Sequence, residues 1–166
     1  MLLKKYIIAP LFIVALMQVC NAQSPGKSRS NALSLELGKS GLIFNLSYDH
    51  KFSSKNFGLR AGVGSNFANS LNAKSFGGGV YYLFGKGNRY FETGIDIQYL
   101  VVNESSDDQK SVSLVYPDYS VTTTFPSLNM GYRCYGKSTL FRVGFSPGMI
   151  VGKFIPGGYI SYGFTF

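Results

Sequence analysis

Tryptophan is absent from this sequence of 166 residues, histidine occurs once and cysteine twice, and charged residues make up only 14% of the chain. A single histidine excludes a metal site built from several histidines. Two cysteines exclude a fold held together by a framework of several disulfides. Because hydrophobic residues make up 45% of the chain, the composition also excludes a disordered protein, which would be polar and highly charged. We therefore expect one compact domain.

Residue types that carry out catalysis are correspondingly few. His50 follows Asp49, but neighbours in a strand point to opposite faces, so the two are not expected to form a dyad. The glycine-rich pieces at 62–64 and 77–79 lack a following helix that could bind phosphate. The acidic residues between Asn103 and Ser120 lack the spacing of a calcium-binding loop. The sequence thus predicts no enzyme, no cofactor and no metal site.

The first 22 residues have the pattern of a secretory signal peptide. Lys4 and Lys5 precede an apolar run from Tyr6 to Val19, and small residues follow in Cys20-Asn21-Ala22. The run is shorter than the roughly 20 apolar residues of a transmembrane helix, so cleavage after Ala22 is the favoured interpretation. An uncleaved anchor and a lipoprotein acylated on Cys20 remain the alternatives.

Three segments follow from this pattern. We expect a signal peptide over residues 1–22, a flexible periplasmic lead over 23–31 and a barrel over 32–166. The formal charge of +8 falls by two, to +6, when Lys4 and Lys5 are removed. A positive balance can favour nucleic acid, but export makes a nucleic-acid partner unexpected.

Beyond the signal peptide, a period of two persists almost throughout, and no helical period does. The 12 Tyr, 14 Phe and 20 Gly of the chain favour strands and tight turns. Eight segments have about the length needed to cross a membrane at a tilt. They are 32–38, 42–52, 57–65, 76–84, 90–102, 121–135, 139–150 and 158–166. We predict an all-β fold, an eight-stranded antiparallel up-and-down transmembrane β-barrel.

Alternate residues of these segments differ in character. In the fifth segment, for example, Ile95 and Ile97 fall on the face opposite Asp96. A soluble barrel would turn such charges toward water, whereas an arginine that faces lipid at the membrane midplane costs about 2–4 kcal/mol. We therefore predict that the polar face points into the barrel. It would gather a lumen charge network of Glu36, Asp49, Arg60, Glu92, Asp96, Arg133 and Arg142.

Unpaired charges in a narrow interior are strongly destabilising, so acids and arginines are expected to neutralise each other across the barrel. The expected sets are Glu36, Glu92 and Asp96 against Arg60, Arg133 and Arg142. A path for ions or protons is the alternative, but the interior of eight strands is just wide enough for side chains to fill it. Glycines on the same face would leave them room.

The links between segments alternate in length, as in barrels that place short turns on the periplasmic side. Short links are predicted at 53–56, 85–89 and 136–138, and longer outer loops at 65–75 and 103–120. The outer link at 38–41 is an exception because it is short. Aromatic residues gather beside the short turns, which is typical of a girdle at a membrane interface.

The chain ends in Tyr162-Gly163-Phe164-Thr165-Phe166. This ending resembles the terminal strand by which bacterial barrel proteins are recognised for assembly, with Tyr162, Phe164 and Phe166 as the signal. Together with the signal peptide, it makes the chain resemble the small outer-membrane β-barrel proteins widespread in Bacteroidota, akin in size to the OmpA/OmpX-type barrels. The resemblance implies the outer membrane of a Gram-negative bacterium, insertion by the barrel assembly machinery and passage with periplasmic chaperones.

Our leading hypothesis is a non-enzymatic envelope protein, expected to be a monomer surrounded by outer-membrane lipid and lipopolysaccharide, whose outer loops make surface contacts. The loop at 103–120 is the main candidate. The alternative is a narrow passive channel for ions or small solutes, and a third possibility is a lipid-modifying enzyme. A fourth, a secreted soluble barrel of the lipocalin type, would need an apolar interior, which Arg60, Asp96 and Arg142 oppose.

Overall fold

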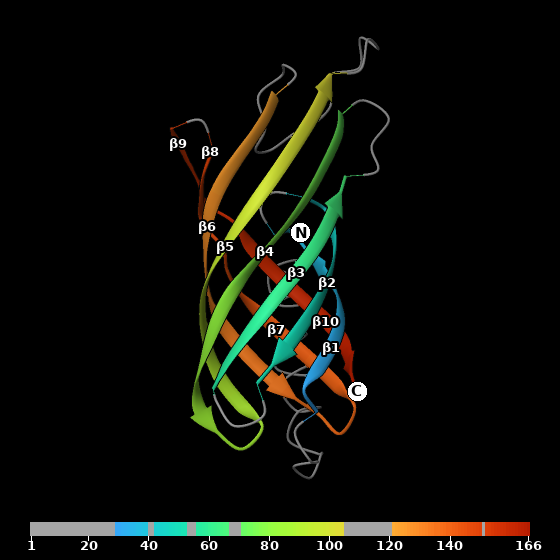
Figure 1. The fold of residues 1–166 in the computed structure, drawn as a ribbon, viewed down its shortest axis with the longest axis vertical. Helices are drawn as coiled ribbons and strands as arrows, with labels where there is room; N and C mark the ends of the chain where they lie inside the picture. Colours follow the sequence, from blue (N-terminus) through green and yellow to red (C-terminus); the bar gives the residue numbers. More distant parts are fainter. Residues whose placement is uncertain (1–28, 40–41, 53–55, 67–70, 105–120, 151) are drawn as a thin grey trace, which may run out of the picture.

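The computed structural model describes residues 29–39, 42–52, 56–66, 71–104, 121–150 and 152–166, and Figure 1 shows their arrangement. The strands are β1 (Asn31–Leu37), β2 (Phe44–Lys51), β3 (Phe57–Ser65), β4 (Leu71–Lys86), β5 (Arg89–Glu104), β6 (Val121–Tyr135), β7 (Thr139–Phe145), β8 (Gly148–Ile150), β9 (Lys153–Ile155) and β10 (Gly158–Thr165). Within these ranges no helix is long and apolar enough to cross a membrane. The predicted signal peptide and most of the predicted lead lie outside the described residues.

The strands form one closed antiparallel sheet. Its order is β5-β4-β3-β2-β1-β10-β7-β6, and a further pairing of β5 with β6 completes the ring. The two ends of the barrel chain pair with each other, for instance through Leu33 and Phe164 of β1 and β10. The predicted all-β barrel of eight antiparallel strands is therefore confirmed.

Strands β8 and β9 are the upper ends of two barrel strands rather than additional members of the ring. The segment predicted as one strand over 139–150 is interrupted at Ser146-Pro147 because proline has no N–H for the sheet. The pairing with β6 nevertheless keeps its register, from Met130 opposite Phe145 to Ser127 opposite Gly148. The last strand, β10, begins at Gly158 as predicted, and it is preceded by the short strand β9, which pairs with β8.

The fourth strand is longer than its predicted range of 76–84. It begins at Leu71 and pairs with β5 as far as Glu104, so residues 71–75 of the predicted loop at 65–75 belong to the strand instead. Ala73 and Ser75 are buried while Lys74 is exposed. This alternation is hard to recognise in the sequence because Ala73 and Ser75 are small and differ little in character from exposed residues. The same hairpin closes at its other end in a two-residue turn, Gly87-Asn88, where Gly87 has a φ of 74°, as tight hairpins require.

The two ends of the barrel differ. We call the end with the short turns at 87–88 and 136–138 the turn end, and the end where β5 and β6 reach Glu104 and Val121 the loop end. Strands β4, β5 and β6 make the loop end taller on one side (Figure 1). The predicted loop at 103–120 lies between β5 and β6; residues 103–104 belong to β5, and residues 105–120 lie outside the described ranges.

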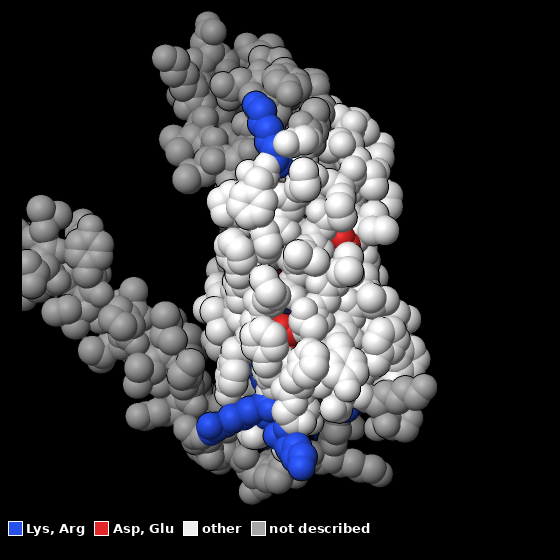
Figure 2. Space-filling model, turned by 90° about the vertical axis from the view of Figure 1, so that its left-hand side faces the viewer, with Lys and Arg blue, Asp and Glu red and all other residues white. Residues whose placement is uncertain are grey.

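The outer surface is apolar and the interior is charged. Ile97 is 61% exposed and Phe145 is 43% exposed, whereas Arg142 is 0% and Asp96 is 3% exposed. The exposed charged side chains of the described residues lie at the two ends. They are Arg29, Lys86, Arg89 and Lys137 at the turn end, with Lys74 and Lys153 at the loop end. Figure 2 shows one face, on which Lys and Arg gather near the ends and uncharged residues cover nearly all of the wall between.

The interior becomes apolar toward both ends, which the sequence did not predict. At the loop end a buried cluster contains Leu42, Ala73, Leu100, Val102, Phe125 and Ile150. Toward the turn end Leu83 and Leu140 are completely buried. The inward face therefore carries its paired charges in the middle of the barrel, with apolar side chains above and below them, and Lys51 is a further buried cation toward the turn end.

Glycines on the inward face leave room for this interior. A methyl group on Gly79 would overlap with the backbone oxygen of Ile95 and the carboxylate of Asp96, whereas a methyl group on Gly158 would meet nothing closer than 3.6 Å. Overpacking of a closed interior costs about 1–3 kcal/mol. We expect Gly79→Ala to destabilise the barrel by this amount and the control Gly158→Ala to leave it unchanged, measured as unfolding free energy by denaturant titration. Equal stability of the two variants would contradict the packing described here.

Candidate functional site: the charged interior

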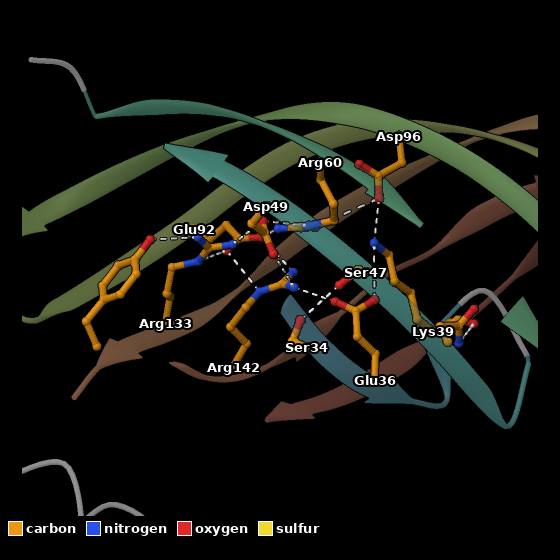
Figure 3. Close-up of polar contacts among 12 residues, drawn as sticks. Ser34, Glu36, Lys39, Ser47, Asp49, Arg60, Glu92, Asp96, Arg133 and Arg142 are labelled. Carbon is orange, nitrogen blue, oxygen red and sulfur yellow. Dashed lines mark hydrogen bonds and ion pairs between the residues drawn. The ribbon is translucent and has the colours of Figure 1, made fainter. Parts of the chain in front are cut away.

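Six strands contribute the seven side chains of the predicted network. Glu36 comes from β1, Asp49 from β2 and Arg60 from β3, while β5 supplies both Glu92 and Asp96. Arg133 of β6 and Arg142 of β7 complete the set. All seven are buried, and Figure 3 shows them meeting in the interior. The structure brings the whole predicted set together.

Glu92 is the centre of this arrangement. Its Oε2 accepts a hydrogen bond from Nε of Arg133 at 2.5 Å, and its Oε1 accepts one from Nη2 of Arg142 at 2.9 Å. Nη2 of Arg60 also donates to Oε1. Arg133 and Arg142 are direct partners across β6 and β7, where two like charges would repel each other. The carboxylate of Glu92 bonds to both guanidinium groups and offsets that repulsion.

Asp49 is a second acceptor on the opposite side of the interior. Its Oδ1 accepts hydrogen bonds from Nε of Arg60 at 3.1 Å and from Nη2 of Arg133 at 2.9 Å. Asp49 and Arg60 are cross-strand partners on β2 and β3, so the sheet register itself sets this pair. Glu36 completes the network by accepting a hydrogen bond from Nη1 of Arg142.

Lys39 is the functional residue that sequence reasoning missed. Its Nζ lies 2.6 Å from Oδ2 of Asp96 and 3.6 Å from Oε2 of Glu36. Asp96 was expected to pair with an arginine, but the nearest arginine atom, Nη1 of Arg60, is 3.9 Å away, so Lys39 is its main partner. Lys39 lies in the short link after β1, directly after Gly38, whose φ of 84° requires a glycine.

The charge balance could have revealed the missing cation. The predicted set holds four acids, Glu36, Asp49, Glu92 and Asp96, but only three arginines, which leaves one negative charge in excess. Adding Lys39 gives four acids and four bases, so the network is neutral. A buried network of charges is stable only when its members are fully paired.

Three tyrosines pack against the arginines. The guanidinium carbon of Arg133 lies 4.3 Å from the ring centre of Tyr81, and that of Arg142 lies 5.0 Å from the ring centre of Tyr159. Nη1 of Arg133 donates a hydrogen bond of 2.8 Å to the hydroxyl of Tyr135. These rings hold the cations through cation–π interactions. Tyr81 and Tyr135 lie toward the turn end, whereas Tyr159 lies on the loop-end side of Arg142.

Little empty space remains among these side chains. A cavity of about 20 Å³ lies on the loop-end side of the network, bordered by Lys39, Asn45, Ser75 and Gln98. This is room for about one water molecule. Together with the apolar side chains toward both ends, this packing leaves little room for water among the described residues.

The other candidate residues predicted from the sequence lie outside the charged interior. His50 is on the outer face, where its Nδ1 is 2.7 Å from Oδ1 of Asn31, while Asp49 points inward, so the two form no dyad. Tyr162, Phe164 and Phe166 are exposed on the last strand and beyond it, and their role as an assembly signal stays a prediction. Among the described residues no group of three or more His, Cys, Asp or Glu could hold a metal ion.

Fold and interior together define a class of protein, a small closed β-barrel with an apolar outer wall and paired charges inside. No protein family and no curated protein matches the sequence. The outer membrane protein Ail of Yersinia pestis, solved in a phospholipid bilayer nanodisc, is similar in fold, with 12% identity, coverage of 84% of this chain and 100% of that chain, and a TM-score of 0.50. At this identity the likeness shows the fold alone.

Two further solved structures match this chain at lower TM-scores. A crystal structure of Ail, the attachment invasion locus protein of Yersinia pestis, has 11% identity and a TM-score of 0.40, covering 82% of this chain and 93% of that chain. Neisserial surface protein A has 13% identity and a TM-score of 0.44 at the same coverage of both chains. The chain is a small eight-stranded β-barrel whose fold resembles that of the outer-membrane protein Ail.

A double-mutant cycle tests whether the charges act as one network. We expect Arg142→Gln alone to cost about 3–5 kcal/mol of unfolding free energy, because it leaves buried acids without their partner. Glu92→Gln and Arg142→Gln together should show a coupling energy of about 0.5–3 kcal/mol. The measurement is urea unfolding of the barrel in lipid vesicles.

The control cycle pairs Arg142→Gln with Lys74→Gln, since Lys74 is exposed at the loop end. These two changes should add within about 0.5 kcal/mol. Strict additivity of the Glu92 and Arg142 changes would count against a shared network.

Proposed function

We propose that this chain is an outer-membrane protein of a Gram-negative bacterium, with a non-enzymatic barrel that anchors a contact surface at its loop end. One observation carries the membrane assignment: large apolar side chains such as Ile97 and Phe145 cover the outside, while the charged side chains of the wall lie inside or at the two ends. A soluble barrel would gain nothing from this arrangement, because it exposes apolar surface to water and removes charges from it.

The turn end lies on the periplasmic side in this proposal. Short turns face the periplasm in outer-membrane barrels, and the predicted signal peptide over 1–22 would deliver the chain to that compartment. The aromatic ending with Tyr162, Phe164 and Phe166 would then be read by the barrel assembly machinery, with periplasmic chaperones as earlier partners. A source within Bacteroidota is likewise part of the proposal, and it rests on the sequence pattern alone.

The packed interior argues against the channel alternative. An ion crossing the barrel would have to pass the apolar cluster at the loop end and then separate Glu92 from three arginines. Breaking a buried ion pair costs about 3–5 kcal/mol. We therefore propose an anchor rather than a channel.

Surface contact is assigned to the loop end. Strands β4, β5 and β6 are the longest of the barrel, and β5 ends at Glu104 and β6 begins at Val121 at the loop end. Loops carried on a rigid scaffold are where recognition usually lies. The proposed partners are lipopolysaccharide and other molecules at the cell surface, and the barrel itself is proposed to be a monomer in outer-membrane lipid. The likeness to Ail supports the fold and adds nothing about partners.

Replacing residues 105–118 with a short Gly-Ser linker tests this assignment. We expect the variant to lose binding to lipopolysaccharide vesicles and to cell surfaces, because the contact surface is removed. It should still fold, as judged by a heat-modifiability gel, because the barrel interior is unchanged. Neither the parent nor the variant should conduct ions in a planar bilayer.

A linker of equal length inserted at the turn between Gly87 and Asn88 is the matched control, and it should leave binding unchanged. Retained binding after loss of residues 105–118, together with sizeable conductance, would favour the channel instead.

A further inference from the structure

A groove runs along the outer wall across β2, β3 and β4, close to the turn end. Its volume is about 580 Å³, which falls within the range of about 300–1,000 Å³ for pockets that hold small molecules. Its main lining residues are Tyr48, His50, Phe52, Leu59, Ala61 and Val80. The lining is therefore mostly apolar, with two polar rings on one side.

The groove exists because one row of the outer surface has small residues. Tyr48 pairs with Ala61, and Ala61 pairs with Gly78 on the next strand. Ala61 and Gly78 are therefore neighbours on the outer surface, and their side chains are only a methyl group and a hydrogen atom. Larger outward residues, Leu59 and Val63, lie on either side of Ala61 along β3. Leu59 lines the groove together with Ala61, whereas Val63 lies outside it.

Polar groups gather at the turn-end side of the groove. Oδ1 of Asn31 accepts a hydrogen bond from the hydroxyl of Tyr48 at 2.9 Å and lies 2.7 Å from Nδ1 of His50. Because an amide oxygen can only accept, Nδ1 of His50 carries the proton. The ring of His50 also packs edge-on against Phe52, with ring centres 5.1 Å apart.

The exposed charged side chains at the turn end are all positive. Arg29, Lys86, Arg89 and Lys137 are exposed there, and among the described residues no Asp or Glu is exposed at this end. The acids that come closest, Asp49 and Glu92, are buried in the interior. A lipid headgroup that reaches this end of the barrel therefore meets a positive surface, to which a phosphate is attracted.

We propose that this groove binds one acyl chain of a phospholipid from the periplasmic leaflet, with the phosphate of that lipid at the positive turn end. The inference rests on the membrane orientation proposed above. In that orientation lipid tails are the material that lies against the wall, and an apolar groove left to water would be unfavourable. The anionic headgroup matches the charge of the turn end, whereas lipids of the outer leaflet would lie toward the loop end.

Filling the groove should abolish this binding. The test compares the parent protein with Ala61→Phe, which places a ring in the groove, and with Val63→Phe, which adds a ring outside the groove on the same strand. Each protein is folded into nanodiscs of phosphatidylethanolamine and phosphatidylglycerol, and native mass spectrometry counts the phospholipids that remain bound after release. A heat-modifiability gel on the same samples measures the folded fraction.

We expect the parent and Val63→Phe to retain one phospholipid and Ala61→Phe to lose it. Ala61→Leu is the second, smaller filling variant if Ala61→Phe folds poorly, and it should show the same loss. Equal retention in all folded variants, or no retention in the folded parent, would overturn the groove assignment while leaving the membrane barrel intact. Failure of the parent to enter nanodiscs would instead contradict the proposed function.

Discussion

The ion pairs of Glu92 with three arginines are the interaction on which the barrel interior depends. Each charge has been removed from water, and only close partners can offset that cost. Glu92 bonds to Arg60, Arg133 and Arg142, and the remaining charges of Asp49, Glu36, Asp96 and Lys39 make the network neutral. Because eight strands leave space for little more than side chains, the network also requires glycines such as Gly79 beside it.

With a neutral, packed interior, structural support and recognition lie in different parts of the barrel. The middle of the barrel carries paired charges, and apolar layers around Phe125 at one end and Leu83 at the other keep water from them. Such an interior makes the barrel a rigid scaffold rather than a conduit. Recognition is then left to the loop end, and lipid contact to the apolar outer wall with its groove at Ala61.

Much of this arrangement could be predicted from a period of two. The alternation of Asp96 and Ile97 was enough to orient β5, and the same argument placed every arginine of the network. Lys39 could not be found in this way, because it reaches the interior from a link that has no period. The start of β4 was missed because Ala73 and Ser75 carry too little contrast. The apolar layer at Leu100 was also missed. Periodicity predicts whether a side chain points inward or outward, but it does not predict at which position along the barrel axis the interior becomes apolar.

The absence of tryptophan allows a direct test of which side faces lipid. Ile97 points outward, and Phe125 points inward at nearly the same height, because Gln98 pairs with Phe125 and Ile97 with Pro126. Single-tryptophan variants Ile97→Trp and Phe125→Trp would be folded into vesicles whose lipid tails carry bromine, and fluorescence quenching would be measured. This orientation predicts strong quenching for Ile97→Trp and little for Phe125→Trp. Strong quenching of Phe125→Trp with none of Ile97→Trp would contradict it.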